Sequence, residues 1–167
     1  YVGSIAAWFD LDLLEECVKK FPSVNFVIIG REHPIVAERL DVLKKYENFC
    51  FLGYKPYTDL PPYVQHFDAG IIPFKKNKLT AAVNPVKLYE YCAAGIPTIS
   101  TDFAKGLEQF KDIIFLASSR EQFVQHLETA LKKSHDDRFR AVLRDFGRKN
   151  SWDSRGQQIR SILYEVR

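Results

Sequence analysis

Residues 25–53, NFVIIGREHPIVAERLDVLKKYENFCFLG, decide the fold class. The stretch begins with a β-branched apolar run that ends in glycine, and it finishes with a second apolar run, FCFLG. Between the two runs, Val36, Leu40 and Leu43 recur at helical spacing. Strands that are apolar on both faces and alternate with helices are typical of a parallel sheet covered on both sides. The stretch therefore predicts a strand–helix–strand unit.

The same alternation continues on both sides of this unit. Residues 1–6, YVGSIA, predict a short strand, and Asp10 is expected to cap a helix that ends before Pro22. Further along we expect a short helix at 60–67, a strand at 68–73, a loop at 75–83, a helix at 84–94, a strand at 97–101, a helix at 103–110 and a strand at 112–117. The sequence thus predicts a doubly wound, Rossmann-like parallel sheet of about six strands.

The carboxyl-terminal part of the chain contains only helical patterns. Ser119 and Gln122 form a capping-box start, and a second helix is expected at 136–149. A third helix starts at Ser151 and carries apolar residues at helical spacing: Ile159, Ile162, Leu163 and Val166. We therefore predict one Rossmann-like domain over residues 1–167, with residues 119–167 as its helical tail.

Composition excludes several classes of protein. Apolar residues make up 46% and charged residues 27% of the 167, which is globular and neither disordered nor collagen-like. The net charge of +3 is too small to indicate a nucleic-acid binder, and the aromatic residues mostly fall on core periods. There is no apolar run of the roughly 18 residues that a membrane span needs. An odd number of cysteines (Cys17, Cys50 and Cys92) indicates free thiols in a reducing compartment.

The start of the sequence also carries an expectation. The chain contains no Met and opens with Tyr1 inside a predicted strand. We therefore expect a fragment of a longer protein.

Ligands of a doubly wound sheet bind at the carboxyl ends of its strands. Neither a GxGxxG fingerprint nor a P-loop occurs at these junctions. Arg31, in the junction GREHP, is a candidate anion contact, although a solvated loop arginine is the favoured alternative. The four histidines show no metal spacing with one another or with cysteine, so no metal site is predicted: His33, His66, His126 and His135.

The junction after the fourth strand is the most informative. Asn84 is predicted as the N-cap of a helix and Pro85 as its first residue, so free amides near Val86 would favour a phosphate. Lys87 opposes the helix dipole, which is understandable if an anion binds beside it. Glu90, one turn later, could accept hydrogen bonds from sugar hydroxyls. This combination predicts a nucleotide site, and a surface ion pair between Lys87 and Glu90 is the alternative.

Residues 84–101, NPVKLYEYCAAGIPTIST, resemble the donor-binding motif of GT-B-fold glycosyltransferases. The similarity is to the large retaining family that uses nucleotide-sugar donors, and to its members that build bacterial cell-envelope polysaccharides. FLGYKPYTDLPPYVQHFDAGIIPF and the final SWDSRGQQIRSIL fit the same family. The resemblance spans essentially the whole chain, but only the carboxyl-terminal, donor-binding half of such enzymes.

The resemblance implies roles for individual residues. Glu90 matches the second Glu of the family's E-x7-E motif, which holds the nucleotide ribose. The first Glu of the motif would fall at position 82, which is Ala in this sequence. The carboxylate that usually contacts the donor sugar in this family is therefore absent at that position. The family's Arg/Lys pair for the diphosphate has no match at residues 3–10, so Lys87 is the candidate replacement.

Further expectations rest on the same resemblance. Gly53, Tyr54 and Lys55 lie where the family contacts the nucleobase, and Asn77 and Thr80 are candidates to face the donor sugar. The donor would be UDP- or GDP-linked, with no cofactor and no metal. An envelope polysaccharide or lipid-linked glycan would be the acceptor, contacted through an absent amino-terminal domain. The full-length enzyme would be cytoplasmic, with a possible peripheral contact at the inner face of the plasma membrane.

Two other functions stay open at this point. One is a nucleotide-sugar epimerase of the same architecture, and the other is a non-catalytic scaffold module that has kept the fold. The residues identify no general base. We expect the isolated chain to bind nucleotide without transferring sugar, and its last helix to expose part of an apolar face that would cross toward the missing half.

Overall fold

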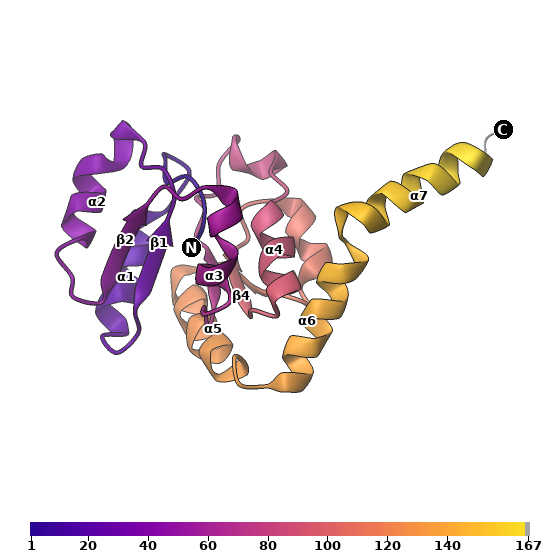
Figure 1. The fold of residues 1–167 in the computed structure, drawn as a ribbon. Helices are drawn as coiled ribbons and strands as arrows, with labels where there is room; N and C mark the ends of the chain where they lie inside the picture. The colour runs from indigo at the N-terminus through magenta and orange to yellow at the C-terminus, as the bar shows by residue number, and fades with distance from the viewer. Residues whose placement is uncertain (166–167) are drawn as a thin grey trace.

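In the computed structural model, which describes residues 1–165, parallel strands alternate with helices (Figure 1). The strands are β1 (Phe26–Ile29), β2 (Phe49–Gly53), β3 (Gly70–Ile72), β4 (Thr98–Thr101) and β5 (Phe115–Ala117). The α-helices are α1 (Leu11–Lys20), α2 (Ala37–Leu43), α3 (Pro61–Val64), α4 (Val86–Ala94), α5 (Arg120–Lys133), α6 (Asp137–Lys149) and α7 (Trp152–Glu165). The 3₁₀ segments are η1 (Pro34–Val36), η2 (Tyr57–Asp59), η3 (Thr80–Ala82) and η4 (Lys105–Phe110). The predicted α/β class with a helical end is confirmed.

The strands form two parallel sheets with a connecting segment between them. β1 pairs with β2, and β4 pairs with both β3 and β5. Residues 1–5 run parallel to β1 and the residues after it through single bridges, Val2 with Ile29 and Ile5 with Glu32. An antiparallel bridge between Phe9 and Phe74 then reaches the end of β3. The six expected strands are therefore five strands and one loosely paired segment among the described residues.

Gly3 explains why the first segment does not form a regular strand. Its φ of 139° departs from extended strand geometry, although its amide still donates to the carbonyl of Ile29 at 2.7 Å. A Cβ on Gly30 would lie 1.9 Å from the carbonyl oxygen of Gly3. The two backbones therefore approach so closely that only glycine fits at position 30.

Most predicted helix ends agree with the structure. Asp10 caps α1 by accepting from the amide of Leu13, and Ser119 caps α5 by accepting from the amide of Gln122. Gly95 ends α4 in the left-handed conformation, with φ 72°. Two segments differ from the prediction. The helix expected at 103–110 is the 3₁₀ segment η4 (Lys105–Phe110), and the strand expected at 112–117 is shorter, since β5 covers only Phe115–Ala117.

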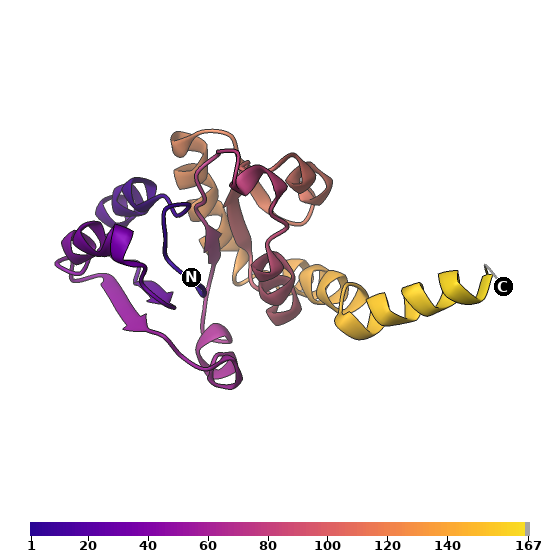
Figure 2. The same cartoon turned by 90° about the horizontal axis from the view of Figure 1, so that it is seen from above.

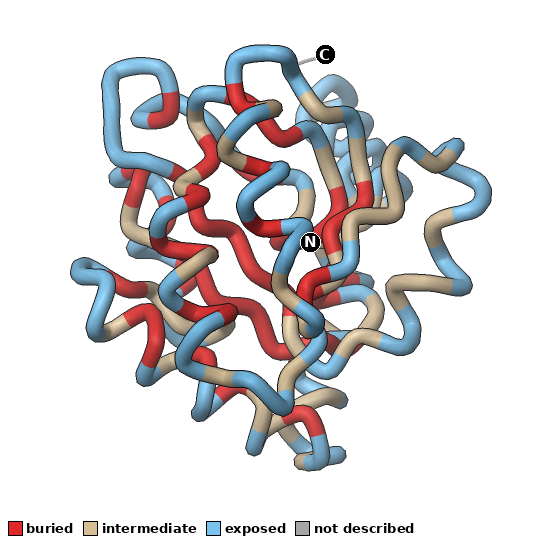
Figure 3. Tube along the Cα trace, turned by 90° about the vertical axis from the view of Figure 1, so that its left-hand side faces the viewer, coloured by how far each residue is buried: buried red, intermediate tan, exposed pale blue. Residues whose placement is uncertain are grey.

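The buried segments gather in the interior of the molecule (Figure 3), and most residues of β1, β3 and β4 are buried. The largest fully buried side chains include Tyr91, Phe9 and Phe103. Cys92 is also fully buried, and burial raises the pKa of its thiol to about 12, so this residue is part of the core. Cys17, Cys50 and Cys92 form no disulfide in the described chain.

The last helix differs from the others in its surroundings. α6 packs against α4, whereas α7 extends away from the body of the molecule in both views (Figures 1 and 2). Ile159, Ile162 and Leu163 are exposed, which confirms that the last helix exposes apolar residues, and Val166 lies outside the described residues. Within residues 1–165, no helix has the length and apolar character needed to cross a membrane.

Candidate functional site

The start of α4 faces the carboxyl edge of the sheet, but its cap differs from the prediction. The helix begins at Val86 with Pro85 as its N-cap, so the prediction of Asn84 as the cap was wrong. Pro85 has an extended ψ of 111°, which leaves Asn84 outside the helix, where its side-chain amide donates to the Tyr89 hydroxyl at 3.3 Å. Among the described residues no side chain caps α4. The amide of Leu88 donates to the carbonyl of Pro85 at 3.1 Å, which leaves the amides of Val86 and Lys87 able to bind an anion.

Lys87 lies half-buried over the first segment of the chain. A Cβ on Gly3 would lie 2.2 Å from Cε of Lys87, and Nζ lies 5.4 Å from the ring centroid of Tyr1. Burial lowers the pKa of the Lys87 ammonium, and the Glu90 carboxylate partly offsets this shift. The sequence analysis missed Gly3, whose lack of a side chain makes room for Lys87. The sequence signal that could have identified Gly3 is its position at a strand-to-helix junction.

Glu90 contacts a tyrosine rather than Lys87. The ion pairs of residues 1–165 do not include Lys87 with Glu90, so the surface pair considered as an alternative is not formed. The Tyr57 hydroxyl instead donates to Oε1 of Glu90 at 3.4 Å, and the charge of Glu90 raises the pKa of Tyr57. Tyr57 is a second site residue that the sequence analysis missed.

Three neighbouring hollows follow one another along this edge. The Trp8 hollow, of about 350 Å³, is lined by Tyr1, Ser4, Trp8, Phe74, Leu79, Thr80, Val83 and Lys87. The Tyr54 hollow, of about 210 Å³, is lined by Val2, Gly3, Ser4, Ile29, Gly30, Arg31, Tyr54, Lys55, Tyr57 and Leu60. The Glu90 hollow, of about 400 Å³, is lined by Val2, Tyr57, Leu60, Pro61, Val64, Gln65, Glu90, Tyr91, Ala93 and Ala94. Because neighbouring hollows share lining residues, an extended ligand could occupy more than one of them.

Arg31 and the residues after β2 come together at the Tyr54 hollow. The guanidinium carbon of Arg31 lies 4.4 Å from the ring centroid of Tyr54, which is a cation–π contact. Gly53 has a φ of 66°, and its carbonyl accepts from the amide of Gly30 at 2.9 Å. Lys55 also lines this hollow. Arg31 is therefore placed beside the residues expected at the nucleobase, and it does not line the Trp8 hollow with Lys87.

Asn77 and Thr80 hold their own loop in place. Oδ1 of Asn77 accepts from the amides of Leu79 and Thr80 at 2.9 and 3.0 Å. The buried Thr80 hydroxyl donates to the carbonyl of Lys75 at 2.6 Å. Thr80 lines the Trp8 hollow, but these bonds already engage its hydroxyl.

The described residues contain no group of three or more His, Cys, Asp or Glu side chains placed to hold a metal ion. The positive groups that face the hollows are Arg31, Lys55 and Lys87. The arrangement can therefore offer an anion a half-buried ammonium and the free amides of α4 on one edge of the sheet.

Comparison with known proteins identifies the family. The family model described as "Glycosyl transferases group 1" matches residues 1–133. The chain belongs to this family. A curated relative is TuaH of Bacillus subtilis (strain 168), named as a teichuronic acid biosynthesis glycosyltransferase, which is 24% identical over 162 residues. The match covers 95% of this chain and 41% of TuaH, so the chain spans less than half the length of that relative.

Solved glycosyltransferase structures share the fold of this group 1 domain. WaaG, a glycosyltransferase involved in lipopolysaccharide biosynthesis, matches with a TM-score of 0.65 and 16% identity, over 90% of this chain and 43% of WaaG. HepE of Anabaena, solved in complex with UDP, matches with a TM-score of 0.69 and 14% identity, over 98% of this chain and 48% of HepE. These likenesses confirm a GT-B type of architecture.

Proposed function

We propose that this chain is the donor-binding half of a glycosyltransferase, and that the pyrophosphate of a nucleotide sugar binds at the start of α4. The observation that carries the proposal is the half-buried Lys87 beside the uncapped first amides of that helix. A desolvated cation without an anionic partner is costly, and a phosphate would pair it while accepting from the amides. The family match supports this assignment.

The nucleoside would extend from Lys87 toward Glu90 and Tyr54. Glu90 is free of Lys87, so its carboxylate can accept hydrogen bonds from ribose hydroxyls after displacing the long contact from Tyr57. The base would enter the Tyr54 hollow, where Arg31, Tyr54 and Lys55 lie. The UDP in the HepE structure supports a nucleoside diphosphate as the ligand class.

The chemistry that this half can supply is electrostatic. As the bond between the sugar and the diphosphate breaks, negative charge develops on the leaving phosphate. The Lys87 ammonium and the amides of α4 would stabilise that charge, at about 1.5–3 kcal/mol for each charge-assisted contact. No metal is part of this proposal.

The proposal also names the class of acceptor. TuaH is named for teichuronic acid biosynthesis and WaaG for lipopolysaccharide biosynthesis, so an envelope polysaccharide or lipid-linked glycan is the proposed acceptor. The chain spans 41% of TuaH, and the acceptor would be held by residues outside it. We propose that the isolated chain binds the donor but transfers no sugar.

Calorimetric titration with UDP, GDP and ADP tests the donor site. Lys87→Ala and Glu90→Ala should each weaken binding of the preferred nucleotide about tenfold or more, because each removes a contact to a charged group. The melting temperature should stay nearly unchanged. Lys132→Ala, at an exposed lysine of α5 that pairs with Glu128, is the matched control and should not alter binding.

Two outcomes would contradict the proposal. Absence of heat with all three nucleotides would favour the scaffold module, which Ala82 also supports because the family motif has Glu there. If Lys87→Ala and Glu90→Ala instead lowered the melting temperature by many degrees, the two residues would be structural.

A further inference from the structure

The Trp8 hollow and the Glu90 hollow stand at the two ends of the series, because they share no lining residue with each other and each shares at least one with the Tyr54 hollow. Lys87 lines the Trp8 hollow, whereas Glu90 and Tyr57 line the hollow at the other end of the series. In a nucleotide sugar the pyrophosphate separates the nucleoside from the sugar. With the pyrophosphate at Lys87 and the ribose at Glu90, as in the proposed function on which this inference rests, the sugar has to approach the Trp8 hollow.

The walls of the Trp8 hollow are mainly apolar. Trp8, Phe74, Leu79 and Val83 are apolar residues of its lining, and Leu79 and Val83 are 65% and 39% exposed. Large apolar side chains left in contact with water at the rim of a hollow favour an apolar occupant. The hollow itself, at about 350 Å³, is large enough for a monosaccharide substituent.

Two hydroxyls of this lining, those of Tyr1 and Thr80, are already engaged within the chain. The Thr80 hydroxyl donates to the carbonyl of Lys75, and the Tyr1 hydroxyl donates to the carbonyl of Ser4 at 3.2 Å. No carboxylate stands among the lining residues in the described chain, and the nearby position 82 is Ala. A sugar hydroxyl placed against Leu79 and Val83 would lose bonds to water and gain none from these side chains, whereas a methyl group would lose none.

We propose that the Trp8 hollow selects a donor whose sugar carries a methyl group, either on an acetamido substituent or at C6 of a 6-deoxy sugar. The shared chemistry is one methyl group placed against Trp8, Leu79 and Val83. Burial of one methyl group predicts about three- to fivefold tighter binding than for the plain hexose.

The test compares four ligands of the protein, all built on whichever nucleoside diphosphate binds (UDP, GDP or ADP). These are the nucleotide alone, its hexose, its 6-deoxyhexose and its N-acetylhexosamine, each titrated into the protein by calorimetry. At least one methyl-bearing sugar should bind about three- to fivefold more tightly than the hexose. The sugar that binds more tightly identifies whether the methyl group is that of an acetamido substituent or that at C6 of a 6-deoxy sugar.

Paired variants separate this role from a structural one. Val83→Ser should abolish the preference for the methyl-bearing sugar and leave the Kd of the nucleotide alone unchanged. Val42→Ser, at a residue of α2 that is 38% exposed, is the matched control and should preserve the preference. Leu79→Ser and Ile35→Ser form a second pair, at 65% and 68% exposure, and should behave in the same way.

The outcomes distinguish this inference from the proposed function. If the nucleotide alone binds normally but the plain hexose binds as tightly as both methyl-bearing sugars, only the assignment of the Trp8 hollow fails. A preference that survives both Val83→Ser and Leu79→Ser would also overturn it. If no nucleotide binds, the proposed function fails and this inference fails with it.

Discussion

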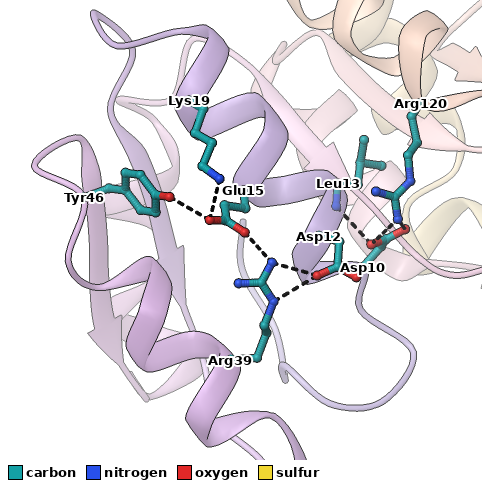
Figure 4. A network of polar contacts seen from close by, with 8 residues as sticks. All are labelled: Asp10, Asp12, Leu13, Glu15, Lys19, Arg39, Tyr46 and Arg120. Carbon is teal, nitrogen blue, oxygen red and sulfur yellow. Dashed lines mark hydrogen bonds and ion pairs between the residues drawn. The ribbon is translucent and has the colours of Figure 1, made fainter.

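At the scale of single residues, Glu15 shows how one carboxylate joins two helices. It accepts from the Tyr46 hydroxyl at 2.6 Å, from Lys19 at 2.9 Å and from Arg39, and Arg39 also holds Asp12 at 2.7 Å (Figure 4). These hydrogen bonds, that from Tyr46 first, lower the pKa of Glu15 from 4.5 to about 2. The contacts therefore stabilise the folded protein only while Glu15 is ionised.

The pH dependence of stability follows from this shift. Because the folded pKa is below the unfolded value, the stabilisation is complete above about pH 4.5 and is lost as the pH falls toward 2. Glu15→Gln should lower the free energy of unfolding by about 1–2 kcal/mol at pH 7. It should also flatten the decline of stability between pH 5 and 3, measured by urea unfolding. Parallel pH profiles for the two proteins would contradict this, and Glu128→Gln on α5 is the control.

At the scale of elements, α4 is positioned by its contact with α6. Gly147 of α6 is buried against the backbone of Ala93, where an added Cβ would lie 2.5 Å from the amide nitrogen. Gly70, at the start of β3, similarly leaves room for the ring of Tyr91. These two glycines let α4 lie close to both neighbours, and this packing fixes where Lys87 and Glu90 stand.

Substitution of Gly147 tests this close packing. Gly147→Ala should lower the free energy of unfolding by about 1–3 kcal/mol, although alanine favours a helix, because the methyl group would overlap the backbone of α4. Gly156→Ala in α7 is the matched control, since no atom lies within 4 Å of its added Cβ in the described residues. It should keep or slightly raise stability. Equal unfolding midpoints for both variants would show that α4 and α6 do not pack this closely.

At the scale of the whole molecule, the body buries apolar residues of its helices, whereas α7 leaves apolar residues exposed. Leu143 of α6 is fully buried, whereas Trp152, Ile159 and Ile162 of α7 are 83%, 59% and 60% exposed. The sequence placed all of these residues on predicted helices, at 136–149 and from Ser151 onward. Whether a helical stripe is buried depends on which other surface reaches it.

The exposed face of α7 should tolerate charge. Ile159→Glu combined with Ile162→Glu should leave the melting temperature within about 2 °C of the parent, because neither side chain packs in the core. The double variant should also associate less in sedimentation velocity runs, since exposed apolar faces favour association. Leu143→Glu is the contrasting control and should lower the melting temperature strongly. A large loss of stability in the double variant would show that α7 packs on the body.

The sequence by itself determined the elements whose signals are local. The apolar runs predicted β1 and β2, Asp10 and Ser119 predicted two helix starts, and the order of residues in α4 predicted the family. These features depend on neighbours within a few positions, so spacing and residue type are enough. The failure at Asn84 is also local, because the extended Pro85 moved the cap by one residue.

Only the tertiary structure decided which residues meet. The contact of Lys87 with Gly3, the bond from Tyr57 to Glu90 and the stacking of Arg31 on Tyr54 join positions far apart in the chain or on different elements. Periodicity places a side chain on a face, but it does not state the distance to another element. That distance depends on packing, on the glycines that permit close approach and on the burial that sets the charge state of each group.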